Sequence, residues 1–228
     1  MNSLDLYAKI EPYIGFYKEY ERLYRVYIER LNSLHVKECL DIGCGNGKFL
    51  QLLQQNGFDA FGIDRSKEMI KRAKKLGVKA ENSELFDLQT NSFEAAVAIG
   101  DVLNYMQKEE LNSFFANLHR VLKKEGYFLA DINTLYGFEE ITAGIFIKDT
   151  KDLFLSIEAD FEDEILDTKI TLFEREEECF KRYSDYIEQY YHALDVFKTI
   201  EGFTLVSVEN ISMFSEEADK NLLIFQRI

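Results

Sequence analysis

The chain has 228 residues, of which 46% are hydrophobic and 30% are charged. This length and composition fit one α/β domain with an insertion and exclude a disordered polymer. The formal net charge is −14, and residues 139–190 contribute −10 of it, with 6 basic and 16 acidic side chains. Because an acidic surface repels polyanions, we expect neither nucleic acid nor a membrane as a partner.

The sequence also argues against secretion, membrane insertion and metal binding. No apolar run approaches the roughly 18 residues that cross a bilayer, and residues 1–9 lack the order of a signal peptide, a basic stretch followed by an apolar one. We therefore expect a cytoplasmic protein. The cysteines and histidines form no C-x-x-C pair and are too scattered for a zinc site or a disulfide framework. They are Cys39, Cys44, Cys179, His35, His119 and His192.

Apolar patterns predict strands that alternate with helices over the first 138 residues. Amphipathic spacing indicates helices over 17–33, 47–55, 67–76 and 108–122. Short apolar runs indicate strands over 38–42, 58–63, 78–80, 94–99 and 126–132. Strands and helices in this order form βαβ units, so the fold class is α/β, with a mostly parallel sheet and helices on both faces.

The pattern changes after about residue 139. Residues 145–192 show period-2 alternation separated by charged turns, which indicates an antiparallel insertion. A helix near 194–200 and strands over 203–208 and 222–227 then resume the α/β pattern. We expect a single domain over residues 1–228, with a helical N-terminal lid over about 1–33.

The strongest motif follows the first predicted strand. Asp41-Ile42-Gly43-Cys44-Gly45-Asn46-Gly47 places three alternate glycines at the end of a parallel strand, where a ligand can approach the backbone closely. An unliganded tight turn is the simpler alternative. The spacing differs from the G-x-G-x-x-G fingerprint of NAD enzymes, and Phe49 follows Lys48 where a P-loop needs Ser or Thr.

An acidic residue ends the second predicted strand. Asp64 lies 19 residues after Gly45, a spacing at which a carboxylate can accept hydrogen bonds from both hydroxyls of a ribose. Nucleotide-dependent oxidoreductases share this acid. Asp64 therefore indicates a nucleoside, and the glycine spacing has to distinguish its kind.

Leu40 to Gly47 closely resembles the first motif of the class I S-adenosylmethionine-dependent methyltransferases. The similarity covers roughly residues 35–135 and, more loosely, the whole chain. It implies a Rossmann-like sheet whose final strand is antiparallel, with S-adenosyl-L-methionine as cofactor and S-adenosyl-L-homocysteine as product. It also implies that the glycine loop contacts the methionine part of the cofactor and that Asp41 orders the loop near the ammonium group.

The same resemblance assigns further residues to the cofactor. Arg65 and Met69 align with positions that line the adenine, and Met69 could instead belong to the core. Glu81 aligns with an acid that meets the adenine amino group, with the Asn82 backbone N–H beside it. The usual acid is Asp, so Asn82 or Ser83 could substitute for the longer Glu81.

Residues 100–105 resemble an Asp-x-x-Asn-Tyr stretch of a small-molecule subgroup that borders the methyl donor. Gly100 would admit the methionine, while Asp101 and Tyr105 would face the substrate. Residues 131–134 resemble a substrate-side element of the same subgroup. An N-terminal tyrosine closes over the cofactor in that subgroup, and its candidates here are Tyr7, Tyr13 and Tyr17.

These features predict methyl transfer to an N or O nucleophile of a small molecule, which must lose a proton. Asp101, Tyr186 and His192 are the candidate catalytic residues, although Asp101 could only cap a helix and His192 could be structural. Residues 145–192 would form a substrate cap whose carboxylates favour a cationic or neutral acceptor. An NAD-type oxidoreductase and a non-catalytic nucleoside sensor are the alternatives. The sequence does not predict the oligomeric state.

Overall fold

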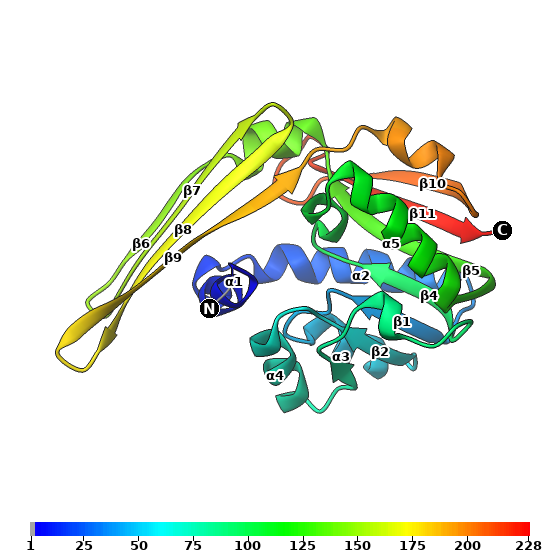
Figure 1. The fold of residues 1–228 in the computed structure, drawn as a ribbon, viewed down its shortest axis with the longest axis horizontal. Coiled ribbons are helices and arrows are strands. Elements are labelled where there is room, and N and C mark those ends of the chain that lie inside the picture. The colour runs from blue at the N-terminus through cyan, green and yellow to red at the C-terminus, as the bar shows by residue number, and fades with distance from the viewer. Residues whose placement is uncertain (1–2) are drawn as a thin grey trace.

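The computed structural model describes residues 3–228, and the side chain of Tyr17 is outside this description. Its centre is a seven-stranded sheet in the order β10-β11-β5-β4-β1-β2-β3 (Figure 1). The strands are β1 (Glu38–Ile42), β2 (Asp59–Ile63), β3 (Ala80–Glu81), β4 (Phe93–Ala98), β5 (Leu122–Asn133), β10 (Phe203–Ile211) and β11 (Lys220–Arg227). β1 to β5 run parallel, and β11 is antiparallel to both of its neighbours. The predicted α/β class and the antiparallel final strand are confirmed.

Helices cover both faces of this sheet, as predicted. One face packs against α2 (Tyr17–Ser33), α3 (Lys48–Gln55) and α4 (Lys67–Lys75). The other packs against α5 (Lys108–Val121) and the 3-10 segment η4 (Leu194–Thr199). Further short segments are η1 (Leu85–Asp87), η2 (Val102–Tyr105) and the π-helical η3 (Gly137–Thr142). The predicted helix near 194–200 is thus a 3-10 segment, whose length is too short for a stable α-helix.

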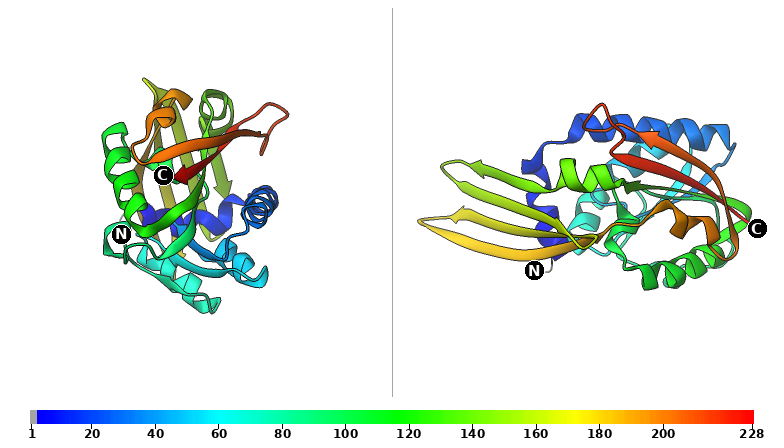
Figure 2. Two further views of the ribbon diagram at one scale, coloured as in Figure 1. Left: turned by 90° about the vertical axis from the view of Figure 1, so that its right-hand side faces the viewer. Right: turned by 90° about the horizontal axis from the view of Figure 1, so that it is seen from above.

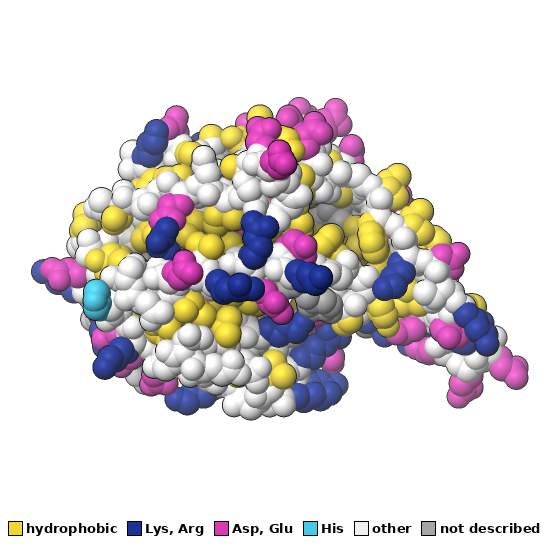
Figure 3. Space-filling view, turned by 180° about the vertical axis from the view of Figure 1, so that it is seen from behind, with side chains coloured by type: hydrophobic (Ala, Val, Ile, Leu, Met, Phe, Trp, Pro, Cys, Tyr) yellow, Lys and Arg dark blue, Asp and Glu magenta, His cyan; other side chains and the backbone are white. Residues whose placement is uncertain are grey.

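The predicted insertion forms a second, four-stranded antiparallel sheet in the order β6-β7-β8-β9. Its strands are β6 (Gly144–Asp149), β7 (Leu153–Glu162), β8 (Ile165–Glu176) and β9 (Cys179–Tyr190). The strands project away from the main sheet as a twisted blade, which Figure 2 shows from two sides. On the face of the body seen in Figure 3, acidic side chains gather toward the free end of this blade and basic ones over the main domain.

The first helix, α1 (Ser3–Ile14), lies between the blade and the main domain (Figure 1). Leu6 and Ile10 of α1 pack against apolar side chains from one face of the blade. Those side chains are Leu153, Leu155, Ile170, Leu172 and Ile187. Alternate residues of a strand face the same side, so this face forms a small core separate from that of the main sheet. Among residues 3–228, no helix is both long enough and apolar enough to cross a membrane.

Candidate active site

Two adjoining cavities open at the carboxyl ends of β1, β2 and β4, where open parallel sheets bind their ligands. The larger one, cavity 1, has a volume of about 660 Å³, and the smaller one, cavity 2, has about 410 Å³. The two share five lining residues: Tyr7, Gly43, Met69, Ile99 and Gly100. A ligand longer than either cavity could therefore extend across both.

The glycine loop is folded against the end of β2 by backbone hydrogen bonds. The N–H groups of Gly43 and Cys44 donate to the carbonyl of Ile63 at 2.8 and 3.0 Å. Gly43 has φ = +71°, and a Cβ on it would lie 2.9 Å from Val102 Cγ2. A Cβ on Gly45 would meet no atom within 4 Å. A side chain at position 43 would therefore clash with Val102, whereas position 45 has free space beside it and lines cavity 2.

Asp64 ties the glycine loop to the start of α4. Its Oδ2 accepts the Gly45 N–H at 2.9 Å, and its Oδ1 accepts the Ser66 N–H at 2.7 Å. Burial raises the pKa of this carboxyl group, although the two N–H donors act in the opposite direction. Each oxygen can accept a further hydrogen bond, and Asp64 lines cavity 1.

Asp41 is a buried carboxylate at the end of β1 with an unused acceptor atom. Its Oδ2 has no hydrogen-bond partner among the residues that the structure describes. Desolvation, and to a smaller extent the charge of Asp64, raise the pKa of Asp41 to about 8. Asp41 also lines cavity 2. A buried carboxyl group is stable in its ionised form only beside a cation, so Asp41 fits the ammonium group of S-adenosylmethionine.

Helix α1 closes cavity 2 from the opposite side. Glu11 accepts a hydrogen bond from the Asn46 amide at 2.9 Å and lies 3.5 Å from Arg72. Of the tyrosines proposed to cover the cofactor, Tyr7 lines both cavities, and burial raises its pKa to about 12. Tyr13 contacts Lys148 instead, and the side chain of Tyr17 lies outside the described residues.

The residues predicted near the adenine divide into two groups. Arg65, paired with Glu84 at 3.4 Å, lines cavity 1, and Met69 lines both cavities. Neither Glu81 nor Asn82 lines either cavity. The Asn82 side chain instead donates to the carbonyls of residues 64 and 65, both at 2.9 Å. Their neighbours Ser83, Glu84, Leu85 and Phe86 line cavity 1.

A buried ionic cluster lies beneath Gly100. Asp131, at the end of β5, accepts hydrogen bonds from the Gly100 N–H at 2.9 Å and the Tyr27 hydroxyl at 2.8 Å. Lys220 Nζ lies 3.0 Å from Asp131 Oδ2 and also pairs with Asp101. The predicted candidate Asp101 thus contacts a lysine, lines neither cavity, and makes no capping hydrogen bond with its side chain.

Sequence reasoning missed Lys220, and the one available signal was a lysine two residues before the apolar run over residues 222–225. Burial raises the pKa of Asp101, although Lys220 opposes that shift. Burial acts in the same way on Asp131, but Lys220 and the Gly100 N–H outweigh it and lower the pKa of Asp131. The two carboxylates therefore differ, with Asp131 the more firmly ionised.

The blade supplies the far wall of cavity 1. Tyr186, Ile187, Glu188 and Tyr190 of β9 line this cavity, as does Tyr105 of η2. The Tyr190 hydroxyl donates to Glu188 Oε2 at 2.5 Å and accepts from Gln107 Nε2 at 3.2 Å. Predicted residues Tyr105 and Tyr186 are therefore brought to the same cavity as Asp64.

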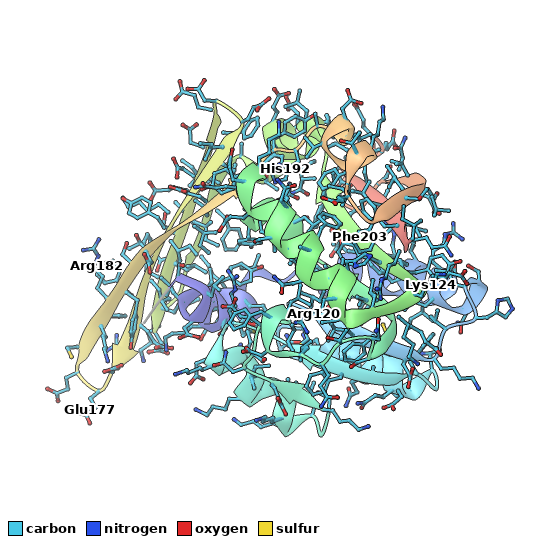
Figure 4. The ribbon with its side chains drawn as sticks, turned by 45° about the vertical axis from the view of Figure 1, so that its right-hand side comes forward. Arg120, Lys124, Glu177, Arg182, His192 and Phe203 are labelled. Atoms are coloured by element: carbon cyan, nitrogen blue, oxygen red, sulfur yellow. The ribbon has the colours of Figure 1, made fainter. Side chains whose placement is uncertain are left out.

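The structure does not bring His192 to either cavity. Figure 4 shows it where the chain leaves β9 beside α5. Its Nε2 lies 3.0 Å from the carbonyl oxygen of Met106, and its ring packs edge-on against Phe197. Burial lowers the pKa of His192. These contacts match the structural alternative considered for this histidine.

Comparisons with known proteins show what the chain is similar to. Residues 40–130 match the family model described as a methyltransferase domain. A Geobacillus sp. (strain WCH70) protein, provisionally named a methyltransferase, is 26% identical over 202 residues, which cover 80% of this chain and 79% of that protein.

Two solved structures share the fold over almost the whole chain. An S-adenosylmethionine-dependent methyltransferase from Clostridium acetobutylicum has a TM-score of 0.77 at 20% identity, covering 97% of this chain and 96% of its own. The sugar N-methyltransferase KedS8 from Streptoalloteichus has a TM-score of 0.74 at 17% identity, covering 98% and 92%. The matched domain, the relative and the shared fold, together with the arrangement of the glycine loop, Asp41 and Asp64, support a class I S-adenosylmethionine-dependent methyltransferase.

Proposed function

We propose that the protein transfers the methyl group of S-adenosylmethionine to an N or O nucleophile of a small molecule. One observation carries this proposal: a single cavity is lined both by Asp64 after β2 and by Tyr186 and Glu188 of the blade. A nucleoside held by Asp64 and an acceptor held by β9 would then face each other within one cavity.

For the cofactor, we propose that cavity 2 holds the methionine part and cavity 1 the nucleoside. Asp41 would pair with the ammonium group through its unused Oδ2, and Asp64 would accept hydrogen bonds from the ribose hydroxyls. Gly43 and Gly45 would let the loop approach the ligand, and Gly100 would border the methyl donor. Gly47, also predicted to bind the cofactor, lines neither cavity, and a Cβ on it would lie 2.8 Å from Ala73 Cβ, so it lets the loop pack against α4. The bound cofactor supplies an already activated methyl group on a sulfonium, so the protein has mainly to align the acceptor and exclude water.

For the acceptor, we propose a cationic or neutral molecule. Among the described residues that line cavity 1, Arg65 is the single Lys or Arg, whereas Glu110 and Glu188 lie on the side of α5 and β9. Carboxylates on that side would attract an amine. The likeness to the sugar N-methyltransferase KedS8 supports a small acceptor of this class.

We propose that Tyr186, rather than Asp101 or His192, removes the proton that the acceptor loses. Tyr186 lines cavity 1, whereas Asp101 is paired with Lys220 and His192 bonds to the Met106 carbonyl. Geometry comes before pKa in choosing a general base, because the base must reach the proton that it removes. Tyr186 and the neighbouring Glu188 satisfy this condition for an acceptor bound against β9.

We also propose that α1 acts as a lid and that the blade, over about residues 145–192, acts as a substrate cap. Ser3, Leu4 and Tyr7 of α1 line cavity 1, and Tyr7 and Glu11 line cavity 2. Entry of the cofactor would then require α1 to move, and the apolar contacts of α1 with β7 and β8 would link that movement to the cap.

The test is a turnover assay with a panel of small amines, amino sugars and alcohols, in which S-adenosylhomocysteine is measured as the product. We expect turnover with at least one amine, abolished when the acceptor is omitted. A thermal-shift assay with S-adenosylhomocysteine serves as the acceptor-independent control, since a ligand at about 100 times its Kd stabilises by roughly 2.7 kcal/mol. Binding of the cofactor without turnover of any panel member, alongside turnover of a protein substrate, would contradict a small-molecule acceptor.

A further inference from the structure

Lys220 is a buried lysine whose partners all lie beneath the two cavities. Its Nζ pairs with Asp101, lies 3.0 Å from Asp131 Oδ2 and donates to Asn133 Oδ1 at 2.9 Å. The register of β11 on β5 pairs Lys220 with Asn133 and Leu222 with Asp131. Since alternate residues share a face, Lys220, Asp131 and Asn133 point to the same side of the sheet.

The carboxylate of Asp131, which Lys220 contacts, also accepts hydrogen bonds from the backbone of residues 100 and 101. Its Oδ1 accepts the Gly100 N–H at 2.9 Å, and its Oδ2 accepts the Asp101 N–H at 3.3 Å. Both residues have left-handed backbone conformations, with φ = +82° at Gly100 and +65° at Asp101. A non-glycine residue in this region is strained, so the surrounding bonds must hold it there. Gly100 lines both cavities.

We infer that Lys220 is a positioning residue for methyl transfer: through Asp101 and Asp131 it fixes the backbone of residues 100 and 101 under the methyl donor and sets the charge there. Lys220 itself lines neither cavity, so it acts through these two aspartates. The inference rests on the proposed placement of the cofactor over Gly100.

Besides holding the backbone of residues 100 and 101, Lys220 sets the net charge of the cluster that it forms with Asp101 and Asp131. Asp101 faces Lys220 of β11 and Asp131 of β5, and the phenols around it are those of Tyr7, Tyr20, Tyr27 and Tyr105. With both aspartates ionised, the cluster carries one net negative charge. Without the ammonium group of Lys220, the buried carboxylates of Asp101 and Asp131 would lie side by side, and one of them would hold a proton up to a higher pH.

This charge distinguishes the cofactor from its product. S-adenosylmethionine carries a sulfonium cation, whereas the thioether of S-adenosylhomocysteine is neutral at that atom. An added negative charge below the site therefore favours the first ligand over the second. Loss of packing alone would weaken both ligands by the same factor.

The experiment compares three variants: Lys220→Met, the double variant Asp101→Asn/Lys220→Met, and Lys198→Met as an exposed control on η4. The Kd values of S-adenosylmethionine and S-adenosylhomocysteine are measured by calorimetry between pH 6 and pH 9, on protein shown to be folded by circular dichroism. For Lys220→Met we expect both ligands to bind about tenfold more weakly or worse. We further expect the ratio of the product Kd to the cofactor Kd to rise about threefold or more at pH 9 and to fall back at pH 6.

The double variant keeps the cluster at one negative charge but lacks the tether. We expect it to bind both ligands weakly with the wild-type ratio at every pH, and we expect Lys198→Met to match the wild type. If Lys220→Met does not fold, the double variant carries the test, and wild-type affinity in it would overturn the inference. A pH-independent ratio in a folded Lys220→Met variant would make Lys220 merely structural.

One more variant separates this inference from the cofactor placement on which it rests. If Asp64→Ala weakens S-adenosylhomocysteine and Lys220→Met does not, the role of Lys220 is wrong and the placement stands. If both variants bind as tightly as the wild type, the placement of the cofactor is wrong.

Discussion

The cofactor side and the cap side of cavity 1 are built in different ways. On the cofactor side, backbone N–H groups and a few buried carboxylates make the main polar contacts, as in the bonds of Asp64 to Gly45 and Ser66. On the cap side, the lining comes from side chains of the edge strand β9, such as Tyr186 and Glu188. Backbone recognition restricts the sequence to glycine at specific positions, whereas an edge strand accepts many side chains without losing its hydrogen bonds.

The two sides also differ in charge. Residues 1–138 carry 18 basic and 19 acidic side chains, whereas residues 139–190 carry 6 and 16. Under the proposed function, the balanced part would bind one fixed ligand, the cofactor, and the acidic part would bind the acceptor. Four experiments test this division, from the largest expected effect to the smallest.

The first experiment concerns Asp41 and the pH dependence of stability. Its pKa is raised to about 8 in the folded protein, whereas in the unfolded chain an Asp titrates near about 4. Between these values the folded state holds an extra proton, so the free energy of unfolding should fall as the pH rises from about 4 to about 8. Each pH unit between the folded and unfolded pKa values corresponds to about 1.4 kcal/mol, which makes this the largest effect.

Urea denaturation of the wild type and of Asp41→Asn at pH 5 and pH 8 measures this effect. The wild type should lose more stability between the two values than the variant does. Added S-adenosylhomocysteine should reduce that loss, because its ammonium group would stabilise the ionised carboxylate. Parallel pH profiles for the two proteins would show that Asp41 titrates normally.

The second experiment concerns the backbone of the glycine loop. Gly43→Ala places a Cβ at φ = +71° and 2.9 Å from Val102 Cγ2. The left-handed conformation costs roughly 1–2 kcal/mol and the overpacking roughly 1–3 kcal/mol. Gly77→Ala is the matched control, since Gly77 has φ = +77° and a Cβ on it would meet no atom within 4 Å.

Thermal and urea denaturation should show a loss of stability in both glycine variants, larger in Gly43→Ala. S-adenosylhomocysteine should bind Gly77→Ala with unchanged affinity and Gly43→Ala at least about tenfold more weakly. Equal affinities in the two variants would mean that the loop at Gly43 does not contact the cofactor.

This difference between backbone and side-chain recognition explains what the sequence could predict. The alternation of strands and helices is visible in hydrophobic periodicity, and the glycines and Asp64 stand at fixed places relative to strands, so fold and cofactor loop could both be predicted. The blade was visible as period-2 alternation, but nothing in its sequence indicated which edge strand would face the cavity.

Lys220 and His192 show why the rest could not be predicted. Lys220 contacts Asp101 across 119 residues of sequence, because β11 inserts between β5 and β10. No local pattern reports such a contact. His192 follows β9 closely in sequence, yet the chain turns there and the ring bonds to the Met106 carbonyl away from both cavities. Proximity in sequence to a lining strand therefore did not indicate a place in the cavity.

The third experiment compares Asp64, which follows β2, with Asp59, which is the first residue of that strand. Asp64→Ala should weaken S-adenosylhomocysteine by about 1–3 kcal/mol, because the ribose hydroxyls would lose a charged acceptor. Asp59→Ala is the control, since Asp59 is exposed and pairs with Lys79 at 2.9 Å. Its removal should change affinity by less than about 0.5 kcal/mol. Calorimetric titration of both folded variants measures the difference in affinity. Equal affinities would mean that Asp64 does not contact the ribose.

The fourth experiment concerns the cap and compares two glutamates of the blade. Glu188 lines cavity 1, whereas Glu177 lies at the tip of the β8–β9 hairpin, far from the main domain (Figure 4). Glu188→Gln and Glu177→Gln remove the same charge from the same acidic segment.

If a cationic acceptor is attracted by the Glu188 carboxylate that it contacts, the acceptor KM should rise about fivefold in Glu188→Gln, the equivalent of about 1 kcal/mol, and stay unchanged in Glu177→Gln. The Kd of S-adenosylhomocysteine should stay unchanged in both, and the difference in KM should shrink near 1 M salt, where the Debye length is about 3 Å. An equal rise in KM for both variants would mean that the overall field of the blade attracts the acceptor and that Glu188 has no special part in it.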